Sequence, residues 1–230
     1  PLDQEPRPLV VGERVNAQGS RKVKELLLAD DYAGLLQIAR GQVEGGAHVL
    51  DVCTALNERD DEAAQMRTLV RLLAQSVDAP LMIDSTEPDV IESALRVYPG
   101  RCIVNSVNLE KGGERVRRVL PLARRYGAAV VCMTIDEKGM AQTAERKAEI
   151  ARRLTGVARE HGLEPDALVF DALTFTLATG SQEYRRSALE TLAGIRLIKA
   201  ENPGVFTVLG VSNVSFGLAK PAREVVNAVF

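Results

Sequence analysis

The sequence contains no tryptophan, only two histidines and only three cysteines among its 230 residues, and each scarcity argues against a class of site. Without tryptophan, the aromatic stacking platform of a sugar- or single-strand-binding protein is not expected. Two histidines leave little material for a histidine metal centre. The cysteines are odd in number and lack CxxC spacing, which argues against a disulfide framework and predicts a reducing, cytoplasmic location.

The net charge and the hydropathy of the sequence argue against nucleic acid and membranes as partners. The net charge of -2 gives no electrostatic reason to expect nucleic acid or an anionic membrane surface. No apolar run approaches the roughly 20 residues that span a bilayer, and no signal peptide opens the chain. The chain begins with Pro1, and residues 1–8 are polar and proline-rich. We therefore expect a linker over residues 1–8 and one domain over residues 9–230, excised from a larger multidomain enzyme.

What the sequence does contain is a repeated alternation of short apolar strands and helices. The predicted strands cover residues 9–16, 47–52, 79–84, 102–105, 128–134 and 167–171, and a seventh begins at residue 205. The predicted helices cover residues 21–28, 32–44, 60–75, 114–126, 144–161, 183–201 and 221–230, with a further helix that starts near residue 88. This alternation predicts a parallel sheet, and the continuous apolar character of the strands indicates that both faces are covered.

Two architectures have this pattern, an open doubly wound sheet and a closed (β/α)8 barrel. A dinucleotide-binding doubly wound sheet is expected to carry GxGxxG after an early strand, and the motif is absent. We therefore predict an α/β fold of the (β/α)8 TIM-barrel type. Because such a barrel has eight units and the pattern repeats seven times, the eighth β/α unit is expected to be missing from this chain.

Each predicted strand ends in, or just before, a carboxylate or an amide. These residues are Asn16, Asp51, Asp84, Asn105, Asp136, Asp171 and Asn213. Barrel enzymes keep their chemistry at the carboxyl ends of the strands, so we expect these side chains to meet in one pocket. Any one of them has a structural alternative, such as helix capping by Asp84.

A site of acids and amides, with no lysine or arginine among them, suits a neutral heterocycle rich in donors and acceptors. A carboxylate accepts two parallel N–H bonds from an amino-pyrimidinone edge, and an asparagine both donates and accepts. Magnesium held by several carboxylates is the alternative. No phosphate-binding glycine loop accompanies the acids, so we assign no metal to this domain.

Six stretches of the sequence resemble the pterin-binding methyltransferase family, in particular the folate-binding domain of cobalamin-dependent methionine synthases. They are GERVNAQGSRK at 12–22, PLMIDST at 80–86, IVNSV at 103–107, RRYGAAVVCMTIDEKGMAQTAERK at 124–147, FDALTFTLATG at 170–180 and GVSNVSFG at 210–217. The resemblance covers nearly the whole chain after residue 9, and it implies a (β/α)8 barrel.

The resemblance also implies roles for individual residues. Asp84, Asn105 and Asp171 match the ligands of the pterin edge, and Asn213 matches the asparagine near N5, where it would act as the catalytic hydrogen-bond donor. Three further matches at the rim are Glu13, Asn16 and Asp136. Lys220 is a candidate for the glutamate tail of folate, with an exposed, solvated lysine as the alternative.

The implied function is that of a methyltransferase in methionine synthesis. Such a domain binds 5-methyltetrahydrofolate and presents the N5 methyl to cob(I)alamin, which another domain of the same polypeptide carries. Zinc in these enzymes is bound by cysteines of a different domain. The alternatives are a stand-alone methyltetrahydrofolate:corrinoid protein methyltransferase, a dihydropteroate synthase, or a pterin-binding module without turnover by itself.

The sequence departs from the family pattern at two places. Where relatives have Asp-Pro-Asn after the sixth strand, this chain has Asp171-Ala172-Leu173. Where they have asparagine soon after the aspartate of the second strand, it has Cys53. Asp171 is a predicted pterin ligand and Asp51 a predicted strand-end residue, so both departures bear on how complete the hydrogen-bond network of the site is.

Overall fold

The computed structural model describes residue 2 and residues 5–230, so three residues of the predicted linker (1, 3 and 4) lie outside the described part. The chain divides into two compact units. Unit 1 consists of Pro1–Ser106 and Pro121–Val130, and unit 2 consists of Val107–Leu120 and Val131–Phe230.

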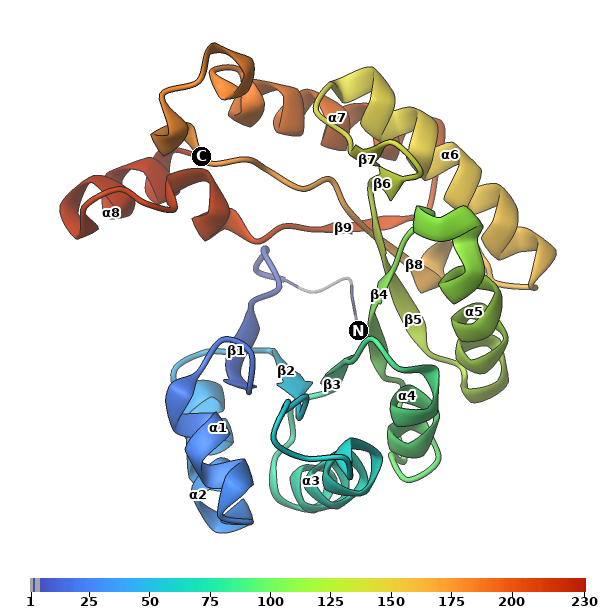
Figure 1. The fold of residues 1–230 in the computed structure, drawn as a ribbon. Helices are drawn as coiled ribbons and strands as arrows, with labels where there is room; N and C mark the ends of the chain where they lie inside the picture. Colours follow the sequence, from blue (N-terminus) through green and yellow to red (C-terminus); the bar gives the residue numbers. More distant parts are fainter. Residues whose placement is uncertain (1, 3–4) are drawn as a thin grey trace. The chain divides into compact units, whose positions relative to one another are not determined.

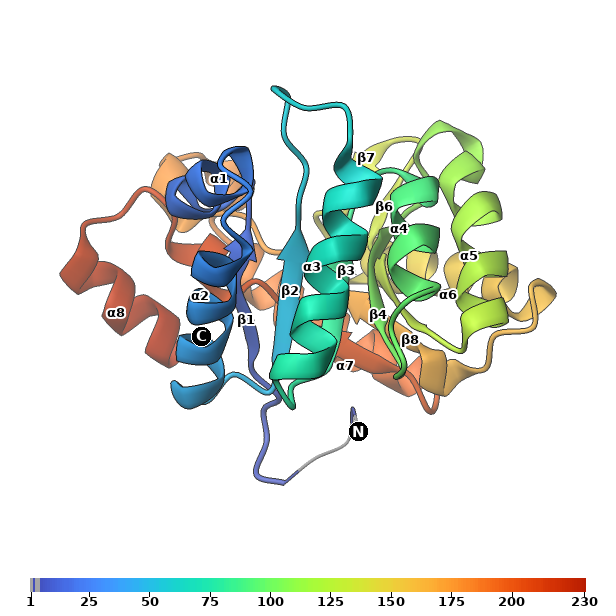
Figure 2. The same cartoon turned by 90° about the horizontal axis from the view of Figure 1, so that it is seen from below.

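Unit 1 is built from parallel strands with helices along them (Figures 1 and 2). Its strands are β1 (Val11–Asn16), β2 (Val49–Cys53), β3 (Leu81–Asp84) and β4 (Ile103–Val107), the last residue of β4 belonging to unit 2. Its helices are α1 (Arg21–Leu28), α2 (Tyr32–Glu44), α3 (Glu62–Ser76) and α4 (Pro88–Leu95). Neighbouring strands pair in parallel, with Leu50 opposite Leu81 and Asp84 opposite Asn105.

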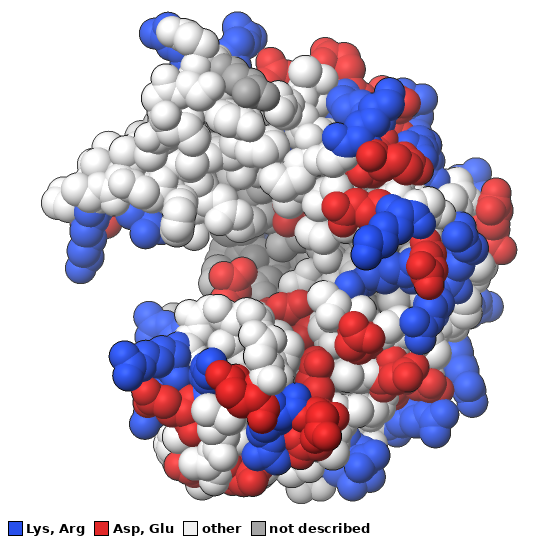
Figure 3. Space-filling model, in the orientation of Figure 1, with Lys and Arg blue, Asp and Glu red and all other residues white. Residues whose placement is uncertain are grey.

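Local signals explain why the first helices begin where they do. The hydroxyl of Ser20 accepts a hydrogen bond from the Val23 N–H at the start of α1. The carboxylate of Asp31 accepts one from the Gly34 N–H at the start of α2. In α3 the buried residues recur at helical spacing and form one face: Gln65, Met66, Leu69, Val70 and Leu73. Acidic and basic side chains are interspersed over the solvent side of this unit (Figure 3), in line with the small net charge.

Unit 2 contains the remaining strands and helices. Strand β5 (Ala129–Met133) and helix α5 (Glu114–Tyr126) are shared between the units. The other elements are the hairpin β6 (Ile135–Asp136) and β7 (Gly139–Met140), α6 (Ala144–Glu160), β8 (Leu168–Asp171), α7 (Ser187–Glu201), β9 (Phe206–Val208) and α8 (Lys220–Val229). Single turns of 3-10 helix are η1 (Glu110–Gly113), η2 (Pro165–Ala167), η3 (Leu177–Thr179), η4 (Gln182–Tyr184) and η5 (Val211–Ser215). The strands β8 and β9 pair in parallel.

The order of the strands confirms the predicted fold class. Over the described residues, the seven strands of the main sheet follow one another as β1-β2-β3-β4-β5-β8-β9, which is their order along the chain. A doubly wound sheet reverses direction at a switch point, whereas the strands of a (β/α)8 barrel advance in one sense. The chain is therefore an α/β protein of the barrel type with seven of the eight strands that such a barrel requires.

The structure differs from the sequence prediction in detail. The predicted polar loop at 137–143 includes the strand β7, which pairs antiparallel with β6 just before the loop. The helix predicted over 183–201 is the 3-10 turn η4 followed by α7. The seventh strand is shorter than its apolar sequence indicates, because the chain turns into η5 directly after Gly210. None of the described helices combines the length and the apolar character needed to cross a membrane.

Candidate functional site

Four of the predicted strand-end residues form one hydrogen-bonded group in unit 1. The side-chain amide of Asn16 donates to Asp51 Oδ2 at 2.8 Å and to Asp84 Oδ2 at 2.9 Å. The amide of Asn105 donates to Asp51 Oδ1 at 3.3 Å. These residues come from β1, β2, β3 and β4, so the carboxyl ends of four consecutive strands meet as the sequence analysis predicts for this part of the chain. We call this set the acid–amide group.

Asn16 is held in a single orientation. Its Oδ1 accepts hydrogen bonds from the backbone N–H groups of Gln18 (2.9 Å) and Gly19 (3.2 Å), in the turn that follows β1. Because the oxygen faces the turn, the NH₂ group must face the two carboxylates. All four hydrogen-bonding positions of the Asn16 side chain are thus used within the protein. Its contribution to a site is to fix the carboxylates of Asp51 and Asp84.

Asp51 is the buried centre of the group, with 3% of its surface exposed. Burial raises the pKa of its carboxyl group from 3.8 to about 7. The hydrogen bonds from Asn16 and Asn105 act against this rise, and the charges of Asp84 and Glu13 add to it. Asp51 therefore exchanges a proton near neutral pH, next to the aspartate predicted to hold the pterin edge.

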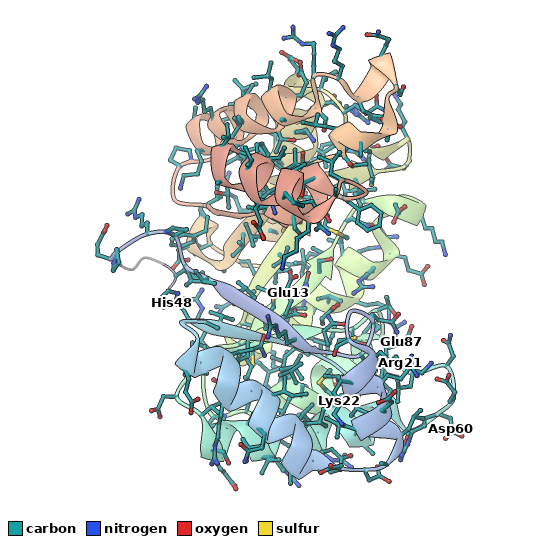
Figure 4. All side chains as sticks on the ribbon, turned by 90° about the vertical axis from the view of Figure 1, so that its left-hand side faces the viewer. Glu13, Arg21, Lys22, His48, Asp60 and Glu87 are labelled. Atoms are coloured by element: carbon teal, nitrogen blue, oxygen red, sulfur yellow. The ribbon has the colours of Figure 1, made fainter. Side chains whose placement is uncertain are left out.

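Glu13 is exposed on β1, and the three hydrogen bonds that join the acid–amide group are made by other residues. Figure 4 shows it along the strand, between His48 near the amino end and Arg21 and Glu87 beyond the carboxyl ends of β1 and β3. A hollow opens at the carboxyl ends of β1 and β2, lined by residues 17–21, Lys24 and residues 55–58. The hollow and the acid–amide group thus lie at the same end of these strands.

In unit 2, Asp136 is engaged in an ion-pair cluster. It is 1% exposed, and its Oδ2 accepts hydrogen bonds from the guanidinium groups of Arg146 and Arg153, the latter at 3.0 Å. Its Oδ1 accepts the backbone N–H of Lys138 at 3.0 Å. Both oxygens of Asp136 are therefore occupied by groups of the protein, a feature that sequence analysis missed because both arginines come from the following helix, α6.

Asp171, the last residue of β8, is part of a hydrogen-bond network with the loop that follows the strand. Its Oδ1 accepts the backbone N–H of Leu173 at 2.8 Å, and its carbonyl oxygen accepts the N–H of Thr134 at 3.1 Å. Beside it, the ammonium of Lys147 donates to the carbonyl oxygens of Ala172 (2.6 Å) and Leu173 (3.2 Å). Ala172 and Leu173, which differ from the family pattern, therefore belong to a loop that these hydrogen bonds hold in place.

Asn213 and Lys220 follow β9 and are both exposed. Asn213 lies in η5, where its backbone N–H donates to the Gly210 carbonyl at 3.1 Å. A Cβ at position 210 would lie 3.0 Å from Asn213 Nδ2, so glycine leaves room for this amide. Lys220 is the first residue of α8. The structure keeps both side chains accessible, and their predicted roles stay predictions.

Two groups were not among the predicted site residues. Asp51 was noted only as a strand end, and its central place depends on contacts between strands. Lys147 had a sequence signal, since it falls on the apolar face of α6 with Ala144, Ala148, Ala151 and Leu154, all of them buried. A lysine at a core position of an amphipathic helix requires buried acceptors, and these are the carbonyls after β8.

The three cysteines have structural roles. All three cysteines are buried and form no disulfide. Burial raises the pKa of the thiols, to about 11 for Cys53 and about 12 for Cys102 and Cys132, so they are protonated core residues at neutral pH. Within the described part of the chain, no three His, Cys, Asp or Glu side chains are grouped in a way that would hold a metal ion.

Comparison with known sequences shows the family to which the chain belongs. The profile of the family described as "Pterin binding enzyme" matches residues 12–230. The chain belongs to this family. The resemblance seen in its sequence motifs is thereby confirmed at the level of the family.

Curated relatives include methionine synthases of this family. The chain is 45% identical over 234 residues to the methionine synthase of Mycobacterium tuberculosis and 44% identical to that of Mycobacterium leprae. Both alignments cover 100% of this chain, and they cover 20% and 19% of the relatives. The chain therefore spans about a fifth of the length of these relatives and is homologous to one region of them.

Solved structures show the same fold at low sequence identity. A dihydropteroate synthase from Xanthomonas albilineans superposes with a TM-score of 0.67 at 16% identity, covering 99% of this chain and 83% of the other. The enzyme from Yersinia pestis gives a TM-score of 0.62 at 17% identity, with coverages of 88% and 70%. At such identities the likeness concerns the fold, and it supports the barrel assignment.

Proposed function

We propose that this chain binds 5-methyltetrahydrofolate and presents its N5 methyl group for transfer to cob(I)alamin carried by another domain of the same polypeptide. The observation that carries the proposal is the acid–amide group, in a chain that belongs to the pterin-binding family and aligns along its whole length with methionine synthases. The reaction would be one step of methionine synthesis in the cytoplasm, a compartment that suits three unpaired cysteines.

In unit 1 the ligand we assign to the pterin edge is Asp84, assisted by Asn105. A pterin presents an amino group and a ring N–H side by side, and an ionised carboxylate accepts both. Asn16 already donates to Asp84 Oδ2, and Asn16 is itself fixed by two backbone amides. Asp84 is therefore held in place before a ligand arrives, which reduces the entropy lost on binding.

In unit 2 we carry forward Asp171 as an acceptor for pterin N–H groups, Asn213 as the donor to N5 and Lys220 as a partner for the glutamate tail. The methyl group leaves a tertiary amine, and that step is favoured by a donor whose hydrogen bond strengthens as negative charge develops on N5. The Asn213 amide is accessible and can supply such a donor. The attacking nucleophile comes with the corrinoid, so no serine or cysteine nucleophile is required of this chain.

The test is calorimetric titration of the 230-residue chain with 5-methyltetrahydrofolate, followed by a spectrophotometric methyl-transfer assay with added cob(I)alamin. We expect D84A to weaken binding by about 1–3 kcal/mol, because bound N–H groups lose their acceptor. D89A removes an acid of the same charge from the exposed surface of α4 and is expected to bind as the wild type does. Absence of binding by the wild type would refute the proposal, and binding without methyl transfer would reduce the chain to a pterin-binding module.

A further inference from the structure

Lys147 is a fully buried lysine in α6, with 0% of its surface exposed. Its ammonium group donates to three backbone carbonyl oxygens, those of Ala141 (2.8 Å), Ala172 (2.6 Å) and Leu173 (3.2 Å). A lysine ammonium has three N–H groups, so each of them has one acceptor. Burial of an ammonium is costly unless it is paired in this way, and an apolar side chain would fill the same space at lower cost.

The surrounding residues are arranged to accept this side chain. A Cβ at Gly194 of α7 would lie 2.7 Å from Lys147 Cδ, so the absence of a side chain at position 194 lets the lysine pass. The ammonium lies 6.0 Å from the centre of the Phe175 ring, which stacks on Tyr184 at 4.9 Å. Residues before α6, after β8 and within α7 thus converge on one ammonium group.

Lys147 is connected to Asp171 through the backbone of Leu173. Leu173 has a φ of 54°, which is unfavourable for a branched side chain and requires support from its surroundings. Its carbonyl oxygen accepts hydrogen bonds from Lys147 and from Thr191 Oγ1 (2.8 Å). Its N–H donates to Asp171 Oδ1. Lys147 and Thr191 therefore fix the backbone on either side of Leu173 through the hydrogen-bonded carbonyl groups of Ala172 and Leu173. The N–H of Leu173 in turn fixes one oxygen of the Asp171 carboxylate.

We propose that Lys147 is a positioning residue of the folate site: it fixes the Ala172-Leu173 backbone so that the Leu173 amide orients the Asp171 carboxylate toward its ligand. The inference rests on the proposed function, in which Asp171 accepts pterin N–H groups. Lys147 itself does not touch the ligand, and its effect passes through Asp171.

The charge state of Lys147 gives the inference a pH signature. Burial lowers the pKa of Lys147 to about 8, while the carboxylates of Asp171 on β8 and Glu190 on α7 act in the opposite direction. Further ionisable side chains of the surrounding loop are Arg185, Arg186 and Tyr184, whose ring stacks on Phe175. Above about pH 8 the amine has one N–H fewer, and one carbonyl of the loop loses its donor. Folate affinity of the wild type should fall as the pH rises through this range.

The first experiment is a double-mutant cycle measured by calorimetry with 5-methyltetrahydrofolate on the 230-residue chain. We expect K147M to bind roughly tenfold more weakly, the effect of one disturbed hydrogen bond to a charged group. We expect K147M/D171N to bind no more weakly than D171N alone, since Lys147 acts through Asp171. A loss in K147M that adds fully to that of D171N, or no loss at all, would overturn the proposal.

The chain offers a matched control in Lys199 of α7. Its Nζ also donates to a backbone carbonyl, that of Val205 at 2.6 Å, and also lies near a phenylalanine ring, Phe206, at 5.8 Å. It precedes β9, away from the carboxyl ends of the strands, so K199M makes the same chemical change without touching the Asp171 loop. We expect K199M to keep the affinity and the pH profile of the wild type.

A second measurement separates this inference from the proposed function. In the ligand-free protein, amide hydrogen exchange at Leu173 is expected to be at least roughly tenfold faster in K147M than in the wild type and in K199M. Unchanged protection of Leu173 would overturn the positioning role whether or not folate binds. If K147M does not fold, the wild-type pH profile decides: affinity that stays constant from pH 7 to pH 9.5 would overturn the proposal.

Discussion

The side-chain amide of Asn16 donates a 2.9 Å hydrogen bond to the carboxylate of Asp84, although the strands that carry them are separated in the sheet by β2. The bond spans 68 positions of sequence and bridges over the buried Asp51, to which Asn16 also donates. A single asparagine thus sets the positions of two carboxylates. The part of the proposed site that lies in unit 1 depends on these two hydrogen bonds of Asn16.

Replacement of Asn16 by alanine should reduce both stability and binding. Asp51 and Asp84 each lose one hydrogen-bond donor in N16A, and we expect the free energy of unfolding to fall by about 1–3 kcal/mol. Folate affinity should fall as well, because Asp84 is no longer held in place. Urea unfolding and calorimetry measure the two effects. Asn108, also half-buried and bonded to Glu110, provides N108A as a control that should retain the affinity; equal behaviour of both variants would contradict the assignment.

Asp51 should make stability depend on pH between about 4 and 7. Its carboxyl group has a pKa of about 7 in the folded chain against an ordinary value of 3.8, so the folded state holds the proton over this range while the unfolded state does not. The wild type should therefore lose stability relative to D51N as the pH rises, by at most about 1.4 kcal/mol per pH unit. Urea denaturation at several pH values tests this, and a constant difference between the two proteins would show that Asp51 is ionised throughout.

The sequence predicted those elements whose boundaries are set locally. Helices α1 and α2 begin after Ser20 and Asp31, whose side chains cap them, and both were predicted with the bounds observed. The strands were located by their apolar runs, and their parallel order follows from the alternation with helices. The end of the seventh strand could not be predicted, because apolar residues continue beyond Val208 into η5, a turn that hydropathy does not distinguish from a strand.

The candidate site could be predicted only in part, since its hydrogen bonds join distant segments. The residue types at the strand ends were evident, and their grouping in unit 1 follows from the parallel register. Which oxygen receives which donor was not evident: Asn16 donates to Asp51 and Asp84, and both carboxylate oxygens of Asp136 accept hydrogen bonds from the protein. Such saturation depends on side-chain geometry, which no sequence pattern encodes.

The ion pairs of Asp136 with Arg146 and Arg153 should stabilise the folded protein. D136A leaves the guanidinium groups of Arg146 and Arg153 without their shared acceptor, and because both arginines are partly exposed we expect a loss of about 1–3 kcal/mol rather than the cost of a fully buried charge. Thermal unfolding measures it. Folate affinity of the folded D136A should stay close to that of the wild type and of R153A. A much weaker affinity in D136A than in R153A would instead place Asp136 in contact with the ligand.

Asn213 should affect methyl transfer more than binding. A donor whose hydrogen bond strengthens only as charge develops on N5 contributes little to the ground-state complex, so the dissociation constant of N213A should change little. Loss of one such donor lowers a rate by roughly 10²–10³-fold in comparable sites. The measurement is single-turnover transfer of the methyl group from 5-methyltetrahydrofolate to added cob(I)alamin, alongside calorimetry on the same preparation.

Two further variants decide whether the Asn213 amide itself is responsible. G210A introduces a Cβ that would lie 3.0 Å from Asn213 Nδ2, so it should displace the amide and slow the transfer while Asn213 is still present. S212A changes the exposed neighbouring side chain and leaves the backbone carbonyl that Ser215 bonds, so it should transfer at the wild-type rate. If N213A and G210A both transferred as fast as S212A, the donor to N5 would have to be sought in another residue, because displacement and removal of this amide would then have no effect on the step it is proposed to assist.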